Sequence, residues 1–110
     1  MSERPELVYK ILRPSERDVL ERFGRFAGSP DDERDGFVHL STREQLAGTL
    51  AKHFADETEL AIVALDVAAM GDALRWEESR GGALFPHLYG AILTPMVRGE
   101  LDRSELDDEP

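Results

Sequence analysis

Short apolar segments alternate along the chain with clusters of polar residues, Gly and Pro, and most of these segments have the pattern of β-strands. They are rich in β-branched and aromatic residues and end at residues that form turns. The longest, ELAIVALDV, is apolar through its centre, which predicts a central strand covered on both faces. We expect five or six strands, in the segments LVYKIL, FVHL, ELAIVALDV, LRWEES, HLYGAIL and MVRGEL.

The first of two main helices is predicted directly after the first strand. Ser15 has the position of a cap for the segment ERDVLERF, and Gly24 has the position of a C-terminal stop. Val19, Leu20 and Phe23 follow one another at helical spacing. They are therefore expected to form an apolar stripe that faces the sheet.

The second main helix is predicted after the segment FVHL. Ser41 and Glu44 have the spacing of a capping box, which predicts a helix that begins at Thr42. Its apolar stripe consists of Leu46, Leu50 and Phe54. The segment between the two helices, RFAGSPDDERDG, is predicted to be a connection made of turns, in which the Asp residues cap and are solvated.

Together these elements predict an α+β fold with a single domain over residues 1–101. We expect a mixed, twisted and split sheet of five to six strands, packed by the two main helices. The chain of 110 residues is long enough to bury one core. Residues 102–110 contain five acidic residues and one Arg, and this acidic tail is expected to be disordered.

Composition and charge exclude several classes of function. The chain has no Cys, which excludes disulfides, thiolate metal sites and Cys nucleophiles. No apolar run approaches the roughly 20 residues that cross a bilayer, and MSERPELVYK lacks the apolar core of a signal peptide, so we expect a cytoplasmic protein without a membrane partner. The net charge of −10 disfavours nucleic acid as a partner, because Lys and Arg supply most of that affinity. The pattern does not predict an oligomeric state.

Two of the three histidines lie in apolar strands bounded by turn residues. His39 shares a strand face with Phe37 and lies just before a helix N-terminus, where free amides favour an anion. His87 shares a face with Tyr89. We expect the two segments to form one pocket, in which either histidine can act as an acid or a base. Taken alone, a histidine in an apolar strand is more often structural and bonded to a carbonyl or a carboxylate.

Other residues have a plainer interpretation. His53 has no motif around it and is expected at the surface or flank of its helix. Trp76 and Phe85 are expected in the core. The segment RGGALFPH is predicted to be a loop, because it contains a flexible Gly pair and because Pro86 forces the preceding residue into an extended conformation. No ligand spacing predicts a metal site.

The strings YKIL, GRFAGSPDDERDGFVHLST, QLAGTLAKHF and LRWEESRGGALFPHLYG resemble a family of small bacterial proteins known as domain of unknown function nine-five-two. The resemblance covers about residues 7–97, and the paired strings DGFVHLST and FPHLYG are its most specific part. Membership implies no established reaction.

The order of elements is more remotely similar to the ADP-ribosyltransferase-like fold, in which a split sheet clamps NAD in a cleft. This resemblance implies that Lys10, His39 with Ser41, and His87 lie on the three strands that carry the site. It makes NAD the candidate cofactor and a transferase the candidate enzyme class. The glutamate that many such transferases carry in a late motif has no counterpart here.

The first hypothesis is therefore a domain that binds a small molecule, NAD or another phosphate-bearing metabolite, and that acts on it as an ADP-ribosyltransferase-like enzyme. His39 and His87 are the candidate catalytic residues, and the candidate ligand-binding residues are Lys10, Ser41, Thr42, Arg43, Arg80 and Tyr89. The alternative is a non-catalytic protein-interaction module, in which the histidines are structural and the acidic tail or an apolar edge contacts a partner.

Overall fold

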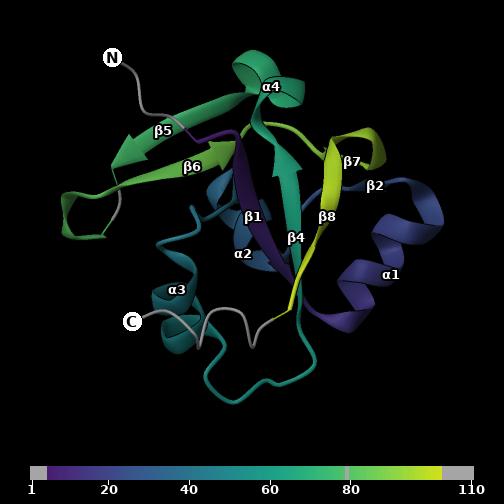
Figure 1. The fold of residues 1–110 in the computed structure, drawn as a ribbon, viewed down its shortest axis with the longest axis horizontal. Coiled ribbons are helices and arrows are strands. Elements are labelled where there is room, and N and C mark those ends of the chain that lie inside the picture. Colours follow the sequence, from purple (N-terminus) through teal and green to yellow (C-terminus); the bar gives the residue numbers. More distant parts are fainter. Residues whose placement is uncertain (1–4, 79, 103–110) are drawn as a thin grey trace.

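The predicted central strand, β4 (Ala61–Asp66), lies in the middle of a three-stranded sheet (Figure 1). Its neighbours are β1 (Leu7–Leu12) and β8 (Val97–Leu101), both antiparallel to it. This computed structural model describes residues 5–78 and 80–102, and for Arg80 it describes the backbone only. The order β1–β4–β8 confirms the central position of ELAIVALDV, and it places MVRGEL in an edge strand.

A second three-stranded sheet carries both histidines of the pocket hypothesis. Its order is β3 (Val38–His39), β6 (Leu84–Leu88) and β5 (Leu74–Glu78), with antiparallel pairing throughout. His39 lies directly opposite His87 in the register. Two strands that are distant in the sequence therefore place the two imidazoles side by side.

A short bridge joins the two larger sheets. The backbone groups of Tyr9 in β1 and Ser41, just after β3, exchange two hydrogen bonds of 2.8 and 2.9 Å. This bridge holds the middle of β1, which carries Lys10, beside the end of β3. A third sheet pairs β2 (Arg25–Phe26) with β7 (Ile92–Leu93).

The α+β class and the single domain are confirmed, but the mixed sheet was wrong. Every strand pair within the described part of the chain is antiparallel. The described strands number eight rather than five or six, because the segment HLYGAIL is divided between β6 and β7, and because β2 is an addition. Strands β2, β3 and β7 are two residues long, too short to show a period in the sequence.

Pro86 lies inside β6, so the prediction that RGGALFPH is a loop was wrong for its last four residues. The carbonyl of Pro86 accepts a hydrogen bond from the N–H of Leu40 at 3.1 Å. The N–H and C=O of one strand residue point to the same side, so the N–H that proline lacks would face the end of β3 and not β5. The strand tolerates proline because the lost donor lies where β3 has already ended.

Helix α1 (Pro14–Phe23) begins two residues earlier than predicted, and Ser15 does not cap it. The N-cap is Arg13, whose backbone N–H donates to Oε1 of Glu16 at 2.9 Å. Pro14 fits the first helical position because its missing N–H has no helical partner there. The helix ends at Gly24 with φ of 69°, as the sequence predicts.

One of the three residues predicted for the apolar stripe of α1 is buried. Leu20 packs in the same core cluster as Val8 and Leu12 of β1. Val19 and Phe23 are 38% and 72% exposed, so the three-residue stripe was wrong. A helical period fixes which residues share a face, but it does not fix how much of that face the neighbouring elements cover.

Helix α3 (Leu46–His53) begins four residues later than predicted. The reciprocal bonds join Thr42 and Gln45: the N–H of Thr42 donates to Oε1 of Gln45 at 3.0 Å, and the N–H of Gln45 donates to Oγ1 of Thr42 at 3.2 Å. The box predicted for Ser41 and Glu44 was therefore wrong by one residue. This shift leaves the Ser41 hydroxyl available for another contact.

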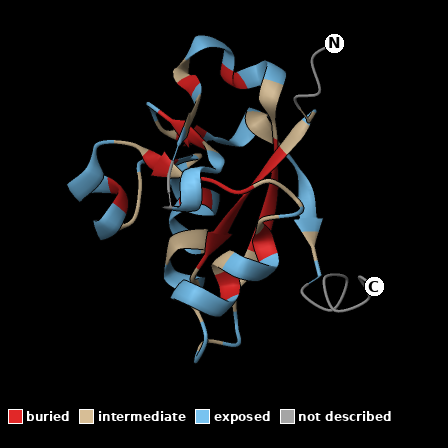
Figure 2. Ribbon diagram, turned by 90° about the vertical axis from the view of Figure 1, so that its left-hand side faces the viewer, coloured by how far each residue is buried: buried red, intermediate tan, exposed pale blue. Residues whose placement is uncertain are grey.

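Helix α3 covers one face of the β1–β4–β8 sheet (Figure 2). Leu46 and Leu50 are buried, as predicted, and they share a cluster with Tyr9 and Ile11, against which Phe54 packs. The opposite face is covered by the cluster that contains Leu20. Burial on both faces explains why ELAIVALDV has no polar face.

The segment predicted to be turns contains a short helix, α2 (Pro30–Asp35). Oγ of Ser29 accepts the N–H of Asp32 at 3.2 Å, and Oδ2 of Asp32 accepts the N–H of Ser29 at 2.9 Å, which forms a capping box. Gly36 ends the helix with φ of 88°. Asp32 is only 2% exposed, so the prediction that these Asp residues are solvated was wrong for this one.

The remaining described helical segments are α4 (Val67–Met70) and single 3-10 turns at Gly71–Ala73, Arg80–Gly82 and Thr94–Met96. Within residues 5–78 and 80–102, no helix has the length and apolar character needed to span a membrane. The prediction of a disordered acidic tail falls, apart from Asp102, outside the described residues.

Candidate functional site

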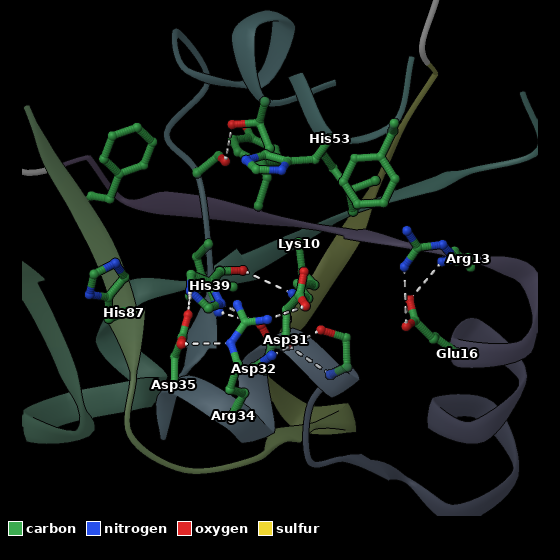
Figure 3. A pocket seen from close by; sticks show the side chains of 18 residues that line it. Lys10, Arg13, Glu16, Asp31, Asp32, Arg34, Asp35, His39, His53 and His87 are labelled. Carbon is green, nitrogen blue, oxygen red and sulfur yellow. Dashed lines mark hydrogen bonds and ion pairs between the residues drawn. The ribbon is translucent and has the colours of Figure 1, made fainter. Parts of the chain in front are cut away.

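A pocket of about 340 Å³ lies where β1, α2, β3, α3 and β6 meet (Figure 3). Lys10 lines it from β1, Asp32 from α2 and His39 from β3. His87 lines it from β6 and His53 from the end of α3. All three histidines of the sequence therefore border one cavity, although they come from three different elements.

Asp32 is the centre of the polar network in this pocket. Its Oδ2 accepts the ammonium of Lys10 at 2.9 Å and the N–H of Ser29 at 2.9 Å. Its Oδ1 accepts the backbone N–H of His39 at 3.1 Å and Nδ1 of the His39 ring at 2.6 Å. One buried carboxylate thus fixes a lysine, a helix N-terminus and an imidazole.

These partners keep Asp32 ionised. Burial by itself would raise the pKa of Asp32, because a low dielectric disfavours the charged form. The hydrogen bond from His39, the charge of Lys10 and the N–H of Ser29 outweigh burial and hold the pKa of Asp32 well below its ordinary range. A buried carboxylate that stays charged is a fixed acceptor for His39 at Nδ1.

The His39 ring lies between two carboxylates. Nδ1 contacts Oδ1 of Asp32 at 2.6 Å, and Nε2 contacts Oδ2 of Asp35 at 3.0 Å. Because Asp32 is ionised, Nδ1 must carry a proton, and Nε2 then carries one only in the imidazolium form. In the imidazolium form, His39 therefore donates to both carboxylates, and its contact with Asp35 is an ion pair.

Asp35 belongs to a chain of exposed charges on α2. Its Oδ1 accepts Nε of Arg34 at 3.2 Å, and Nη1 of Arg34 donates to Asp31 at 3.0 Å. The pKa of Asp35 is lowered, first by the hydrogen bond from Arg34 and then also by the nearby His39. The guanidinium and the imidazole therefore bind one carboxylate together.

His87 is held in the same way by a different carboxylate. Its Nδ1 lies 2.8 Å from Oε1 of Glu77, and its side chain is 7% exposed. The Phe37 ring stacks on it with 4.0 Å between ring centroids. The hydrogen bond from His87, with a second one from Tyr89, lowers the pKa of Glu77. The two imidazole centroids, of His39 and His87, are 5.7 Å apart.

The structure brings together some of the sequence-predicted site residues and not others. His39, His87, Lys10 and Ser41 all line the pocket. The Ser41 hydroxyl lies 3.1 Å from the hydroxyl of Thr49, in place of the capping contact predicted for it.

Among the other ligand-binding candidates, Thr42, Arg43 and Tyr89 do not line the pocket. Thr42 exchanges two hydrogen bonds with Gln45 just before α3, and the hydroxyl of Tyr89 donates to Glu77 at 2.8 Å. The Arg80 side chain lies outside the described residues.

Lys10 has a different position from the one expected of a ligand-binding residue. Its ammonium donates to Asp32 at 2.9 Å and to the carbonyl of His39 at 3.1 Å, and the residue is 7% exposed. Both contacts fix the strand and the ring of His39. Lys10 is therefore placed to position His39 through Asp32.

Sequence reasoning missed the acidic and basic residues that surround His39 and the opposite end of the pocket. Asp32, Asp35 and Arg34 come from α2, and Arg13 lines the far end, where it pairs with Glu57 through two bonds of 2.8 and 3.0 Å. The spacing of Ser29, Pro30 and Asp32 was a signal for a capped helix.

Two further expectations concern aromatic and metal-binding residues. Phe85, expected in the core, is half-buried and lines the pocket, whereas Trp76 packs against the core as expected. Among the side chains that the structure describes, no three His, Asp or Glu residues are grouped as metal ligands would be.

Comparison with known proteins places these observations in a family. Two crystal structures of protein CC0527 from Caulobacter crescentus, one of a double mutant, are similar to this chain with TM-scores of 0.83 and identities of 47% and 48%. Each match covers 87% of this chain and 84% of the other. The solution NMR structure of CC0527 gives a TM-score of 0.78 and 46% identity over 89% and 84% of the two chains.

No curated protein matches the chain. The sequence profile of a family described as "Protein of unknown function (DUF952)" matches residues 11–99. This range includes every residue that lines the pocket except Tyr9 and Lys10. This chain belongs to the DUF952 family.

Proposed function

We propose that this chain binds a small molecule in the pocket and acts on it by proton transfer through His39 and His87. The observation that carries the proposal is the pair of imidazoles, 5.7 Å apart, each held at Nδ1 by its own carboxylate. A carboxylate at Nδ1 fixes the ring and leaves Nε2 as the atom that exchanges a proton with a ligand.

Two such rings are suited to a reaction in which one group loses a proton while another gains one. With 5.7 Å between the ring centroids, the two imidazoles could serve different atoms of one ligand, provided that the ligand displaces Asp35 from Nε2 of His39. Nδ1 of His87 is bonded to Glu77 at 2.8 Å, and among the described residues none bonds to its Nε2. Perturbed carboxylates beside imidazoles in a concave site are typical of acid–base catalysis.

The ligand class in this proposal is NAD or another phosphate-bearing metabolite. The pocket volume of about 340 Å³ is at the lower end of the range for small-molecule sites. The guanidinium groups of Arg13 and Arg34 border it and are suited to phosphate. The net charge of −10 argues against nucleic acid as the carrier of that phosphate.

ADP-ribosyl transfer is the finer form of the proposal. Its support is that Lys10, His39 and His87, which the resemblance assigns to three strands, line one pocket from β1, β3 and β6. Because Lys10 donates to Asp32, the role of Lys10 in such a reaction is to position other residues. The test is whether the bond between nicotinamide and ribose in NAD is cleaved.

The experiment is a titration of the full chain with NAD, ADP-ribose and nucleotides, followed through the three histidine ring signals by NMR. We expect the signals of His39 and His87 to shift, and His39→Asn and His87→Asn to weaken binding. Arg22→Gln, on the exposed side of α1 and outside the pocket, is the control and should bind as the parent does. Unchanged histidine signals at millimolar ligand would contradict the proposal.

One observation favours the alternative, a non-catalytic interaction module. Phe23 is 72% exposed and Val19, one turn earlier on α1, is 38% exposed, so two apolar side chains share a solvent-facing edge. If the chain is such a module, Phe23→Ser abolishes partner binding while His39→Asn leaves it intact. The opposite result, in which only the histidine variant loses its function, favours the small-molecule proposal.

A further inference from the structure

We infer that the ligand of this pocket presents an oxyanion, a phosphate or a carboxylate group, and that the Asp35 side chain occupies the position of that group. The inference rests on the proposed function and adds the chemical class of the ligand and the residue that it must displace. It concerns three side chains, those of Arg34, Asp35 and His39.

The geometry around Asp35 is that of a bound anion. Its Oδ2 lies 3.0 Å from Nε2 of His39, and its Oδ1 lies 3.2 Å from Nε of Arg34. One carboxylate thus contacts an imidazole and a guanidinium at the same time (Figure 3). An oxyanion of a ligand that took the same position would meet the same two donors.

The two carboxylates on His39 differ in how easily they can leave. Asp32 is 2% exposed and is held by the ammonium of Lys10 and the N–H of Ser29, so Nδ1 of His39 stays occupied. The side chain of Asp35 is 35% exposed and that of Arg34 is 67% exposed. Ion pairs of exposed side chains contribute little, because water competes for both partners.

The position of Asp35 in the chain also favours its displacement. It is the last residue of α2, where the unpaired carbonyls of a helix C-terminus repel a carboxylate. Gly36 follows with φ of 88°, so the chain turns away directly after Asp35. The side chain is therefore held by its contacts with Arg34 and His39 and not by its own helix.

A ligand that reaches His39 must compete with Asp35, because Nε2 is the ring nitrogen that Asp32 leaves available. A neutral ligand group would leave the Arg34 guanidinium, which faces Asp35 beside the His39 ring, without the negative charge that it now contacts. A phosphate or carboxylate restores it. Nη1 of Arg34 also donates to Asp31 at 3.0 Å, so the guanidinium keeps one anchor when Asp35 moves away.

Removing the competitor should therefore tighten oxyanion binding. The test compares Asp35→Ala with Asp18→Ala in the full chain, using inorganic phosphate and acetate as separate probes at constant ionic strength. Asp18 is the matched control: it is exposed, it pairs with Arg22 at 3.1 Å, and its replacement changes the net charge by the same amount. Binding is followed through the His39 ring signal, assigned by its loss in His39→Asn.

We expect Asp35→Ala to lower the dissociation constant for at least one probe by about five-fold, the size set by the loss of a weak exposed ion pair. Asp18→Ala should change it by less than about two-fold, and adding Arg34→Gln to Asp35→Ala should reverse the gain. Tighter phosphate than acetate binding identifies a phosphate-bearing ligand, and the reverse identifies a carboxylate.

Equal effects of Asp35→Ala and Asp18→Ala, or no effect of either, overturn the inference, because the gain would then come from net charge or be absent. This failure is distinct from failure of the proposed function. If NAD or a nucleotide shifts His39 and His87 while Asp35→Ala gives no gain, the pocket binds a ligand but Asp35 does not stand in its place. If phosphate binding tightens while no metabolite binds, the inferred oxyanion position stands and the proposed ligand is wrong.

Discussion

Replacing Asp32 with Asn tests the network on which the candidate site depends. The substitution keeps the shape of the side chain and removes its charge. It also turns one of the two acceptor oxygens into an N–H donor, although all four contacts of Asp32 are with donors. The ammonium of Lys10, in a residue that is 7% exposed, then has no counterion within the network.

The expected loss is large. Breaking a buried ion pair by removing one partner costs about 3–5 kcal/mol, since the remaining charge stays buried and unpaired. A domain of this size has a free energy of unfolding of about 5–15 kcal/mol, so Asp32→Asn should remove at least about a fifth of it. Lys10→Met should also destabilise, by about 2–4 kcal/mol, because Asp32 retains three of its four donors.

Urea unfolding of Lys10→Met, of Asp32→Asn and of the variant with both substitutions measures the coupling energy between the two side chains. We expect the double variant to lose at least about 1 kcal/mol less than the two single losses added together, because neither charge is left alone. Additive losses would show that Lys10 and Asp32 do not depend on each other. A loss below about 1 kcal/mol for Asp32→Asn would refute the buried network itself.

Asp32→Asn should also change how the free energy of unfolding depends on pH. The pKa of Asp32 is lowered in the folded chain, so below the ordinary Asp pKa of 3.8 the unfolded state takes up a proton that the folded state does not. The contribution of Asp32 to stability is therefore fully present above about pH 5 and declines as the pH falls toward about 2. The unfolding free energy of Asp32→Asn should fall less steeply over this interval than that of the parent.

Two further pairs of variants test the surroundings of this network. Gly28→Ala places a Cβ 2.8 Å from Cβ of Asp32 at φ of 132°, and it should lower the free energy of unfolding by more than about 2 kcal/mol. Gly36→Ala, at φ of 88° with no atom within 4 Å of the new Cβ, should lower it by about 1–2 kcal/mol, measured by thermal unfolding. The His39 side chain is 40% exposed, so His39→Ala should lower the free energy of unfolding in urea by about 1 kcal/mol. The His87 side chain is 7% exposed, so His87→Ala should lower it by about 2–3 kcal/mol. Equal losses would contradict an effect of this difference in burial.

The sequence predicted the parts of the fold that repeat with a period. ELAIVALDV is central because a strand covered on both faces must be apolar on both, and the structure covers it with two separate clusters. The stripe of Leu46 and Leu50 is buried because a helical period predicts one face. Strands of two residues, such as β3, and the exposure of Phe23 depend on contacts between distant segments, and no local period reports them.

The candidate site was predictable to the same extent. His39 and His87 stood out because each is a polar residue in an apolar strand, and the register places them opposite each other. Asp32 did not stand out, because a carboxylate among turn residues is usually solvated, and its burial follows from β1 and α2 meeting over β3. Lys10 was assigned to the site for its place on the first strand, and its contact with Asp32 gives it a positioning role instead.

The buried pair of Lys10 and Asp32 is better explained by the site than by stability. A buried ion pair gains little over apolar side chains of similar size, because the cost of removing both charges from water offsets their attraction. Lys10 lies on β1 between Val8 and Leu12, which are both fully buried, so an apolar residue would fit the strand pattern there. What an apolar residue cannot do is keep Asp32 charged, and without a charged Asp32 the His39 ring has no fixed acceptor at Nδ1. The double variant of Lys10 and Asp32 separates these explanations: if it folds with most of its stability but no longer orients His39, so that ligand-induced shifts of that ring are lost, the pair serves the pocket.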